Sequence, residues 1–315
     1  MNWRPTARRA ALARRAGILA QLRAHFAAEG VLEVDTPLLG SAGAGDPAIE
    51  SVAVELGQRR FFLQTSPESA MKRLLAGGSG DIYQICKAFR REERSALHRC
   101  EFTILEWYRL GFDHHRLMDD VAALVARVLP GLQLARASFA ELSARCGAPD
   151  PHRATTAELA AFAREVGLVL SAADAGDRVL LLDLLLSELV RRTWPAGEGG
   201  FVYDFPVEQA AYARVRDESP PVASRFELVI GGVELANGWH EVTDVETQRA
   251  RHAAEHAARV ARGQAPMPPD PGLLAALAAG LPDCAGVAIG VDRLVMLALG
   301  GDDIAGVLAF AGDGP

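Results

Sequence analysis

Residues 89–108 read FRREERSALHRCEFTILEWY and combine a charged first half with an alternating second half. The second half, residues 101–108, is rich in Ile, Phe, Trp and Tyr, which is typical of a β-strand. The segment before it, residues 81–90 (DIYQICKAFR), also has the composition of a strand. The two segments therefore predict an antiparallel hairpin whose long loop, residues 92–98, is charged.

The side chains of this hairpin suit an anionic nucleotide and a cationic amine. Arg90 can bind a phosphate through two hydrogen bonds, Glu92 can accept from a base amino group, and the ring of Phe102 can stack on a base. Glu106 and Tyr108 are two residues apart on a strand and face the same side, where a carboxylate and a phenol suit an ammonium group. The alternative is a solvated hairpin with a buried aromatic face. For Arg90 or Glu106 alone that alternative is preferred, but the complete ordered set favours a functional site.

The order F-R-x-E, charged loop, H-x-x-E-F-T-x-x-E-W-Y resembles motif 2 of class II aminoacyl-tRNA synthetases in its lysyl form. Residues 286–293 (GVAIGVDR) resemble motif 3, and an amphipathic helix ending at residues 34–37 (VDTP) resembles motif 1. One short motif is weak evidence, but three in the same order are strong. The resemblance covers roughly residues 8–312. It implies an α+β catalytic core, with a mixed, mainly antiparallel sheet flanked by helices.

The chain is predicted to form one catalytic domain, residues 1–315, with a helical insertion at about 130–197. The first 28 residues lack acids and are rich in arginine, like a transit peptide. However, Leu22, Phe26 and earlier apolar residues recur at helical spacing up to Gly30, which favours a motif 1 helix ended by that glycine. In the family this motif builds a dimer interface, so the resemblance implies a homodimer.

The composition excludes several classes of protein. The chain has 315 residues, and no apolar run in it is long enough to span a membrane. A net charge of −7 argues against binding nucleic acid through bulk positive charge. The four cysteines form no Cys-x-x-Cys pair, which favours buried thiols in a reducing cytosol over disulfides or zinc. We therefore expect a cytoplasmic protein.

A second dense stretch, residues 225–243, reads RFELVIGGVELANGWHEVT. Its glycine pair at 231–232 predicts a tight turn between two strands. Glu227, Glu234 and Glu241 are seven residues apart, and acids on central strands need a cation nearby. Magnesium, a lysine-like substrate and arginine side chains elsewhere are all open as that cation.

The resemblance assigns substrate contacts to several of these residues. It implies that the Ser66-Pro67-Glu68 turn contacts the amino acid, with Glu68 at the amine nearest the carboxylate. From the residues alone, this turn also suits a helix start with Ser66 as N-cap and Pro67 at the first helical position. The match to Asn237 reaches the substrate carboxylate. The match to Glu241 joins the acid and phenol of the hairpin around the ε-ammonium.

The resemblance also implies an ATP site with Mg²⁺ held by Glu227 and Glu234. Arg90 is expected on the α-phosphate and Arg293 on the γ-phosphate, with Arg293 and Phe102 on either side of the adenine. The full expected ATP-binding set is Arg90, Arg91, Glu92, His98, Arg99, Phe102, Glu234, Leu235, Gly290 and Arg293. One departure is that the usual H-N-P-E-F of the family reads H-R-C-E-F at residues 98–102. Arg99 thus stands where relatives have an asparagine that contacts ATP.

The activity implied is the AMP-forming activation of a lysine-type substrate by ATP. The full-length tRNA-charging enzymes carry an N-terminal anticodon-binding domain, and we expect none here, so tRNA is an improbable partner. The chain is more similar to paralogues that activate (R)-β-lysine as an adenylate and ligate it to a lysine of elongation factor P. Ala288, a glycine in lysyl-tRNA synthetases, is the main clue to β-lysine, although it also suits simple packing. A truncated lysyl-tRNA synthetase-like enzyme that activates α-lysine, and a non-catalytic binding module, are the alternatives.

Overall fold

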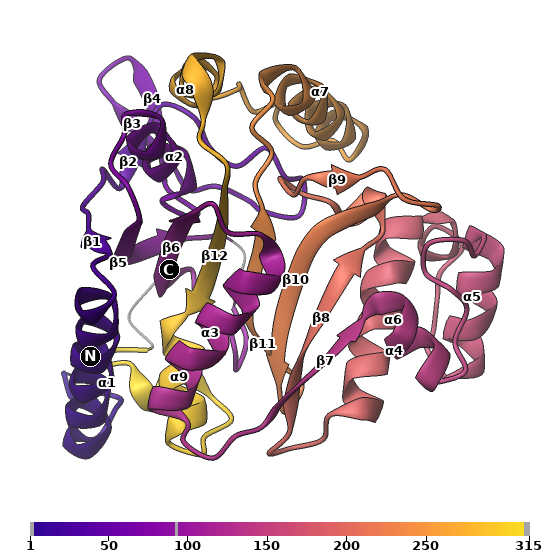
Figure 1. Cartoon of the computed structure of the whole chain (residues 1–315), viewed down its shortest axis with the longest axis horizontal. Helices are drawn as coiled ribbons and strands as arrows, with labels where there is room; N and C mark the ends of the chain where they lie inside the picture. The colour runs from indigo at the N-terminus through magenta and orange to yellow at the C-terminus, as the bar shows by residue number, and fades with distance from the viewer. Residues whose placement is uncertain (1–2, 92–93, 312–315) are drawn as a thin grey trace. The chain divides into compact units, whose positions relative to one another are not determined.

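The computed structural model of the chain describes residues 3–91 and 94–311 (Figure 1). Its contacts divide the chain into two compact units. The first unit extends to Phe112 and includes Arg127–Leu129 and the chain from Val242 onward. The second unit consists of Asp113–Ala126 and Pro130–Glu241. The assignment of the whole chain to one catalytic domain stays a prediction.

The first unit contains the three resembled motifs. Its elements are α1 (Arg9–Ala28), β1 (Leu32–Glu33), β2 (Leu39–Gly40), β3 (Ala53–Leu56), β4 (Arg59–Leu63), α2 (Glu68–Ala76), β5 (Ile82–Phe89), β6 (Glu101–Leu110), α7 (Val245–Ala261), α8 (Pro271–Gly280), β12 (Cys284–Gly290), α9 (Val291–Ala298) and the short 3₁₀ helix η3 (Ile304–Val307). Its main strands follow the order β1-β5-β6-β12, with only the β1–β5 pair parallel. β2, β4 and β3 form a separate antiparallel sheet.

The predicted hairpin and the predicted first helix are both confirmed. β5 and β6 pair antiparallel, with Ile82 opposite Tyr108 and Phe89 opposite Glu101. α1 ends at Ala28, and Gly30 follows with φ +69°, a conformation that side-chain-bearing residues rarely adopt. The apolar face of α1 is buried and anchors the helix, because the ring of Phe26 stacks on Tyr83 with centroids 4.3 Å apart.

Figure 1 shows α2 and α8 side by side in the first unit. The two helices share a buried core with the end of the hairpin opposite its loop, built from Met71, Leu75, Ile82, Tyr108, Leu277, Leu281 and Cys284. This core fixes the far end of β6, where Tyr108 lies. Among the described residues, no helix is long and apolar enough to span a bilayer. All four cysteines are free thiols; Cys284 is buried as predicted, whereas Cys86, Cys100 and Cys146 are only partly buried.

The second unit contains four main strands and one strand of two residues. Its elements are α3 (His114–Val128, whose last residues belong to the first unit), β7 (Leu134–Ser138), α4 (Phe139–Arg145), α5 (Thr156–Glu165), η1 (Asp174–Gly176), α6 (Arg178–Thr193), β8 (Gly199–Phe205), η2 (Val207–Gln209), β9 (Val215–Arg216), β10 (Val222–Ile230) and β11 (Val233–His240). The strand order is β11-β10-β8-β7, with β9 paired to β10 and only the β7–β8 pair parallel. Both units thus have mixed, mainly antiparallel sheets with helices, which confirms the α+β prediction.

The segment at about 130–197 is mostly helical and also includes the strand β7. Figure 1 shows α4, α5 and α6 gathered on one side of β7 and β8. Their apolar faces share one core with those strands, including Phe139, Leu182, Leu189, Val202 and Phe205, each fully buried. This core supports β10 from the side opposite β11, and it explains why an Ala- and Leu-rich segment without recognisable chemistry is part of the fold.

Candidate active site

Glu106 and Tyr108 lie together on β6, as their spacing of two predicts. The Tyr108 hydroxyl donates to Glu106 Oε1 at 2.7 Å, and the two residues are 3% and 2% exposed. In the neighbouring strand, Ala288 of β12 is paired directly opposite Glu106. Side chains of directly opposed residues point to the same face with their Cβ atoms about 5 Å apart. The Ala288 methyl group is therefore a neighbour of the Glu106 carboxylate.

The surroundings of Glu106 are poorly solvated. Burial raises the pKa of the nearby Cys86 thiol to about 12, and the Glu106 carboxylate adds to that rise. Cys86 therefore stays protonated near neutral pH and is not a nucleophile. The Glu106 carboxylate and the Tyr108 phenol share one buried face, and both groups can accept hydrogen bonds from an ammonium group. This face of β6 is therefore a candidate contact for the ammonium group of a ligand.

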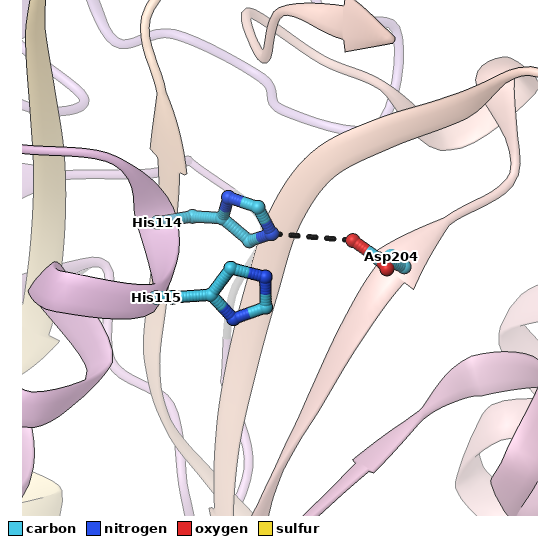
Figure 2. Close-up of side chains that lie close together, drawn as sticks. All are labelled: His114, His115 and Asp204. Atoms are coloured by element: carbon cyan, nitrogen blue, oxygen red, sulfur yellow. Dashed lines mark hydrogen bonds and ion pairs between the residues drawn. The ribbon is translucent and has the colours of Figure 1, made fainter. Parts of the chain in front are cut away.

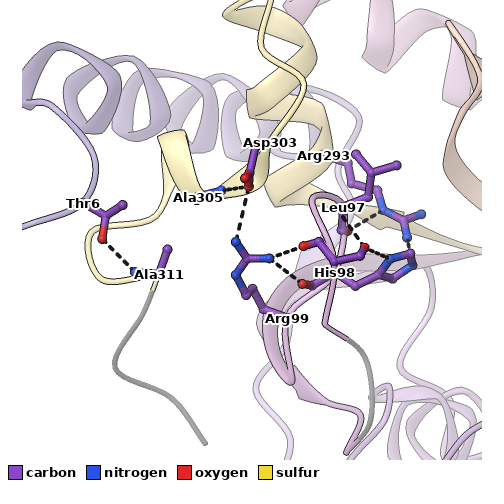
Figure 3. A network of polar contacts seen from close by, with 9 residues as sticks. Thr6, Leu97, His98, Arg99, Arg293, Asp303, Ala305 and Ala311 are labelled. Carbon is purple, nitrogen blue, oxygen red and sulfur yellow. Dashed lines mark hydrogen bonds and ion pairs between the residues drawn. The ribbon is translucent and has the colours of Figure 1, made fainter.

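Arg293 and His98 form the second group in the first unit (Figure 3). Arg293 Nη2 lies 2.6 Å from His98 Nε2, and Arg293 Nε donates to the Leu97 carbonyl at 3.3 Å. A guanidinium can only donate, so His98 Nε2 is the acceptor and Nδ1 carries the ring proton. That Nδ1 lies 2.7 Å from the hydroxyl of Ser95. Gly290 packs against the Arg293 side chain. A Cβ atom placed on Gly290 would lie 3.5 Å from Cδ of Arg293.

Arg90 and Phe102 face each other across the start of the hairpin loop. The Arg90 guanidinium carbon lies 5.2 Å from the centroid of the Phe102 ring, and the Arg90 amide donates to the Cys100 carbonyl at 2.8 Å. This is a cation–π contact. The sandwich of adenine between Arg293 and Phe102 stays a prediction; here the guanidinium over Phe102 belongs to Arg90.

Asp292 connects the three motif regions of the first unit. It is 2% exposed; its Oδ2 accepts the Thr103 amide at 2.8 Å, and its Oδ1 lies 2.6 Å from an Arg15 nitrogen. Arg15 also donates to the Thr103 hydroxyl at 2.8 Å. The buried Asp292 carboxylate therefore links α1 and β6 to the start of α9, where Arg293 is the next residue.

The Ser66-Pro67-Glu68 turn begins α2, but its capping differs from the expectation. The helix starts at Glu68, so Pro67 occupies the cap position and is not the first helical residue. The Ser66 hydroxyl accepts the Glu68 amide at 3.4 Å, a long hydrogen bond. The reason is that the Pro67 carbonyl already accepts the Met71 amide at 3.0 Å and starts the helical ladder. Glu68 itself pairs with the buried Lys72 at 2.5 Å.

In the second unit a β-bulge gathers Glu227, Glu234 and Asn237. Glu227 is paired with Asn237 across β10 and β11, and the register shifts after Leu228. Residues three apart on a regular strand face opposite sides, but the extra residue of a bulge brings them to one side. Accordingly, Asn237 Nδ2 lies 3.3 Å from Glu227 Oε1 and 3.5 Å from Glu234 Oε1.

The charge of this group is partly compensated by Arg225. Arg225 Nη2 donates to Glu227 Oε1 at 2.5 Å, and Arg225 Nε donates to Asn237 Oδ1 at 3.2 Å. Burial raises the pKa of Glu227 to about 7; Arg225 opposes the rise and the Glu234 carboxylate adds to it. Carboxylate and amide oxygens are the ligands that Mg²⁺ prefers. The residues present therefore fit a magnesium ion.

The remaining predicted residues have differing surroundings. Glu241 is fully buried and accepts the Trp239 indole N–H at 2.8 Å within the second unit. Leu235 is 2% exposed, so its contact with a nucleotide stays a prediction. Arg91 is exposed, and its amide donates to the Glu50 carbonyl at 2.8 Å. Glu92 lies outside the described residues.

Sequence reasoning missed Arg225 and Lys72, although the signals were present. Arg225 is two residues before Glu227 on one strand, and therefore on the same face. Lys72 is four residues after Glu68 on one helix, the spacing of a helical ion pair. The role of Asp292 had no such signal, because its partners come from distant parts of the chain.

A histidine cluster at the start of α3 is a possible metal site (Figure 2). Nitrogen atoms of His114 and His115 and a carboxylate oxygen of Asp204 all lie within 4.8 Å of one another, and His114 Nε2 is 3.2 Å from Asp204 Oδ1. The Arg216 guanidinium lies 2.8 Å from that oxygen and 3.3 Å from His114 Nε2. Because Arg216 already brings a positive charge to two of the three ligand atoms, the cluster is better described as an ion-pair network.

The chain matches a model of the family "tRNA synthetases class II (D, K and N)" over residues 1–314. It is 45% identical to the elongation factor P–(R)-β-lysine ligase of Vibrio parahaemolyticus serotype O3:K6 (strain RIMD 2210633), with 98% of each chain covered. The identity is 44% to the ligase of the same name from Vibrio vulnificus (strain YJ016), again over 98% of each chain. It is 43% to that of Salmonella paratyphi B (strain ATCC BAA-1250 / SPB7), over 99% of this chain and 98% of the relative. With the motif residues in these positions, the chain belongs to the class II tRNA synthetase family of the D, K and N type.

Proposed function

We propose that the protein activates (R)-β-lysine with ATP and transfers the β-lysyl group to a lysine side chain of elongation factor P. The names and coverage of its relatives support this substrate and this partner. The observation that carries the proposal is the buried Glu106–Tyr108 pair with Ala288 directly opposite it. A buried carboxylate and a phenol suit an ammonium group, and a methyl group at the pocket wall can select where that ammonium lies.

Activation is attack of the substrate carboxylate on the α-phosphorus of ATP, with pyrophosphate as the leaving group. Two anions must approach each other, so the protein must supply fixed positive charge rather than a general base. In this proposal Arg90 binds the α-phosphate and Arg293 the γ-phosphate, with His98 holding the Arg293 guanidinium in place at 2.6 Å. The Arg90 amide donates a hydrogen bond to the Cys100 carbonyl at 2.8 Å. This hydrogen bond fixes the backbone that carries the Arg90 guanidinium.

A magnesium ion held by Glu227 and Glu234 would neutralise part of the phosphate charge. Asn237 lies between the two carboxylates, within 3.5 Å of both, and orients them through its amide. Without the ion, Arg225 still compensates part of the negative charge of Glu227. In this proposal Asn237 also reaches the substrate carboxylate.

The transfer step requires a neutral amine from the acceptor. The ε-amine of the acceptor lysine attacks the carbonyl carbon of the adenylate, an amide bond forms, and AMP leaves with the electrons of the broken C–O bond. The proton of the attacking amine is lost to solvent or to AMP. In this proposal the Ser66-Pro67-Glu68 turn contacts the amino acid, with Glu68 at the amine nearest the carboxylate. Glu241 joins Glu106 and Tyr108 around the ε-ammonium.

The partners and location of the protein follow from the same proposal. In this proposal it acts in the cytoplasm on elongation factor P and does not charge tRNA. It forms a homodimer through motif 1, which comprises α1 and the residues that follow it up to 37. Leu32 and Leu38, just after α1, are 54% and 39% exposed, and apolar residues of this size are commonly covered in dimers.

The first test is ATP–pyrophosphate exchange with (R)-β-lysine and with L-α-lysine. We expect a strong preference for β-lysine, followed by transfer of labelled β-lysine to elongation factor P and not to tRNA. A preference for α-lysine together with tRNA charging would replace this function by that of a truncated lysyl-tRNA synthetase-like enzyme. Exchange with neither isomer would rule out both and favour a binding module.

The same assay tests the role of Arg90. Arg90→Ala should lower exchange by about 10² to 10³, the cost of one lost preorganised donor. Arg60→Ala is a matched control, because Arg60 is an exposed arginine of the same unit with a surface ion pair to Glu55. Near-normal exchange by Arg90→Ala would remove Arg90 from the mechanism.

A further inference from the structure

Arg99, which stands where relatives have an asparagine, makes several contacts that order the loop of the first hairpin (Figure 3). Its Nη1 donates to the carbonyl of Ser95 and, at 2.7 Å, to the carbonyl of His98. Its Nη2 lies 3.3 Å from Oδ1 of Asp303. The planar guanidinium has enough fixed donors to serve all three acceptors at once.

The two carbonyls belong to the two ends of one tight turn. Ser95 and His98 form an isolated antiparallel bridge, with amide-to-carbonyl distances of 3.1 and 3.4 Å. The Ser95 hydroxyl accepts the Leu97 amide at 3.1 Å and lies 2.7 Å from His98 Nδ1. Arg99 thus joins the two ends of the turn, while the Ser95 hydroxyl holds the Nδ1 side of the His98 ring.

The turn is also attached to the C-terminal part of the first unit. The Ile304 amide donates to the Ala96 carbonyl at 2.9 Å, beside the Arg99–Asp303 pair. Asp303 itself accepts the Ala305 amide at 2.7 Å. Further along, the Thr6 hydroxyl accepts the Ala311 amide at 3.0 Å (Figure 3). The segment that meets Arg99 is therefore itself held to the fold.

We propose that Arg99 is a positioning residue for the nucleotide: it holds the Ser95–His98 turn so that the His98 ring keeps the Arg293 guanidinium aimed at the ATP phosphates. This inference rests on the proposed function, in which Arg293 binds the γ-phosphate. Arg99 acts through His98, whose Nε2 lies 2.6 Å from Arg293. It does not itself contact the reacting atoms.

The proposal predicts a separation of kinetic constants. A loop ordered before ATP arrives lowers the cost of binding equally in the ground state and in the transition state. Losing the Arg99 contacts should therefore weaken ATP binding about 5- to 30-fold, the effect of one or two net hydrogen bonds. The kcat of exchange should change by less than about threefold, and the KM for the amino acid should stay unchanged.

The decisive experiment is a double-mutant cycle in ATP affinity, measured by titration calorimetry on the full-length protein. Arg99→Ala, His98→Ala and the double variant are compared with the unmodified protein. If Arg99 acts through His98, the double variant binds ATP no more weakly than His98→Ala alone. If the two fold-changes multiply, Arg99 contacts the nucleotide itself and the proposal is wrong.

Two further variants complete the design. Arg99→Lys keeps the charge but loses the fork, so its ATP affinity should lie between those of the unmodified protein and Arg99→Ala. Arg94→Ala removes an exposed arginine of the same loop and should leave ATP affinity unchanged. Unchanged affinity in Arg99→Ala would overturn the proposal. Because the readout is ATP binding, it is separate from the exchange assay: failure of exchange with either lysine isomer defeats the proposed function without deciding the cycle.

Discussion

Two hairpins, β5–β6 in the first unit and β10–β11 in the second, each carry candidate functional acids, and they do so in different ways. β6 is regular, and Glu106 and Tyr108 share a face because they are two residues apart. β11 pairs with β10 through a bulge, and Glu234 and Asn237 share a face although they are three apart. In a regular strand the spacing of the residues thus predicts which side chains share a face, whereas in a bulged strand it does not.

The two hairpins also differ in charge. Glu106 is buried, accepts from the Tyr108 phenol and lies near the Cys86 thiol, which stays protonated; in the proposed function it contacts an ammonium group. Glu227 is buried beside Arg225 and near a second carboxylate, Glu234, which suits a compact divalent ion. The first hairpin should therefore decide which amino acid binds, and the second should respond to pH and metal.

The largest expected effect is that of Glu106→Gln in the first hairpin. Glutamine can still accept from Tyr108, so the substitution removes mainly the charge. We expect kcat/KM for the lysine substrate to fall by about 10² to 10³, as when one partner of a buried charge pair is truncated, with the KM for ATP unchanged. Substrate-dependent exchange measures both constants. Glu101→Gln is the matched control, since Glu101 begins the same strand with its side chain 56% exposed. Equal effects of the two substitutions would contradict an ammonium site at Glu106.

Ala288→Gly sharpens the same comparison, because Ala288 is paired directly opposite Glu106. Removing one methyl group from a pocket wall should shift the β-lysine to α-lysine preference toward α-lysine by about 10- to 200-fold. The ratio of kcat/KM for the two isomers in exchange measures this shift. Ala285→Gly is the control, because it removes a methyl group from the same strand opposite Arg109. A loss of activity without a change in the ratio would mean that Ala288 only packs.

The fold and much of the site were predictable from the sequence because their patterns are local. The alternation of residues 101–108, the helix ended by Gly30 and the glycine turn at 231–232 each depend on neighbouring residues, and all three are confirmed. The bulge at β11 was not predictable, because it depends on pairing with another strand. The Arg99–Asp303 contact was not predictable either, since Asp303 is 204 residues away along the chain.

Glu227→Gln tests the second hairpin through pH. Burial raises the pKa of Glu227 from 4.5 to about 7, so the folded state holds this proton more tightly than the unfolded state. The contribution of Glu227 to the free energy of unfolding is therefore fully present below pH 4.5 and is lost as the pH rises to about 7. We expect the unmodified protein to lose about 2 kcal/mol from this group between pH 5 and pH 8. The glutamine variant should not lose it.

Urea unfolding at pH 5 and pH 8 measures this difference. Glu227→Gln should gain stability relative to the unmodified protein at pH 8 while losing Mg²⁺-dependent exchange. Glu218→Gln is the control, since Glu218 is an acid of the same unit whose side chain is 54% exposed. If the two variants show the same pH dependence as the unmodified protein, Glu227 is ionised without cost and the charge contrast between the hairpins is wrong.

The smallest expected effect is on the turn that sets the register of the second hairpin. Gly231 and Gly232 have φ +57° and +78°, as a two-residue hairpin turn requires. A Cβ added at Gly232 meets no atom within 4 Å, so the cost of Gly232→Ala is conformational and amounts to about 1 kcal/mol. Gly232→Asn should cost less, because asparagine tolerates positive φ. Thermal unfolding measures both. If alanine costs no more than asparagine, the turn does not set the register of this hairpin. The register is then held by Glu227, Asn237 and their neighbours across the strands. The two hairpins would in that case be alike, because side chains across the strands would fix both.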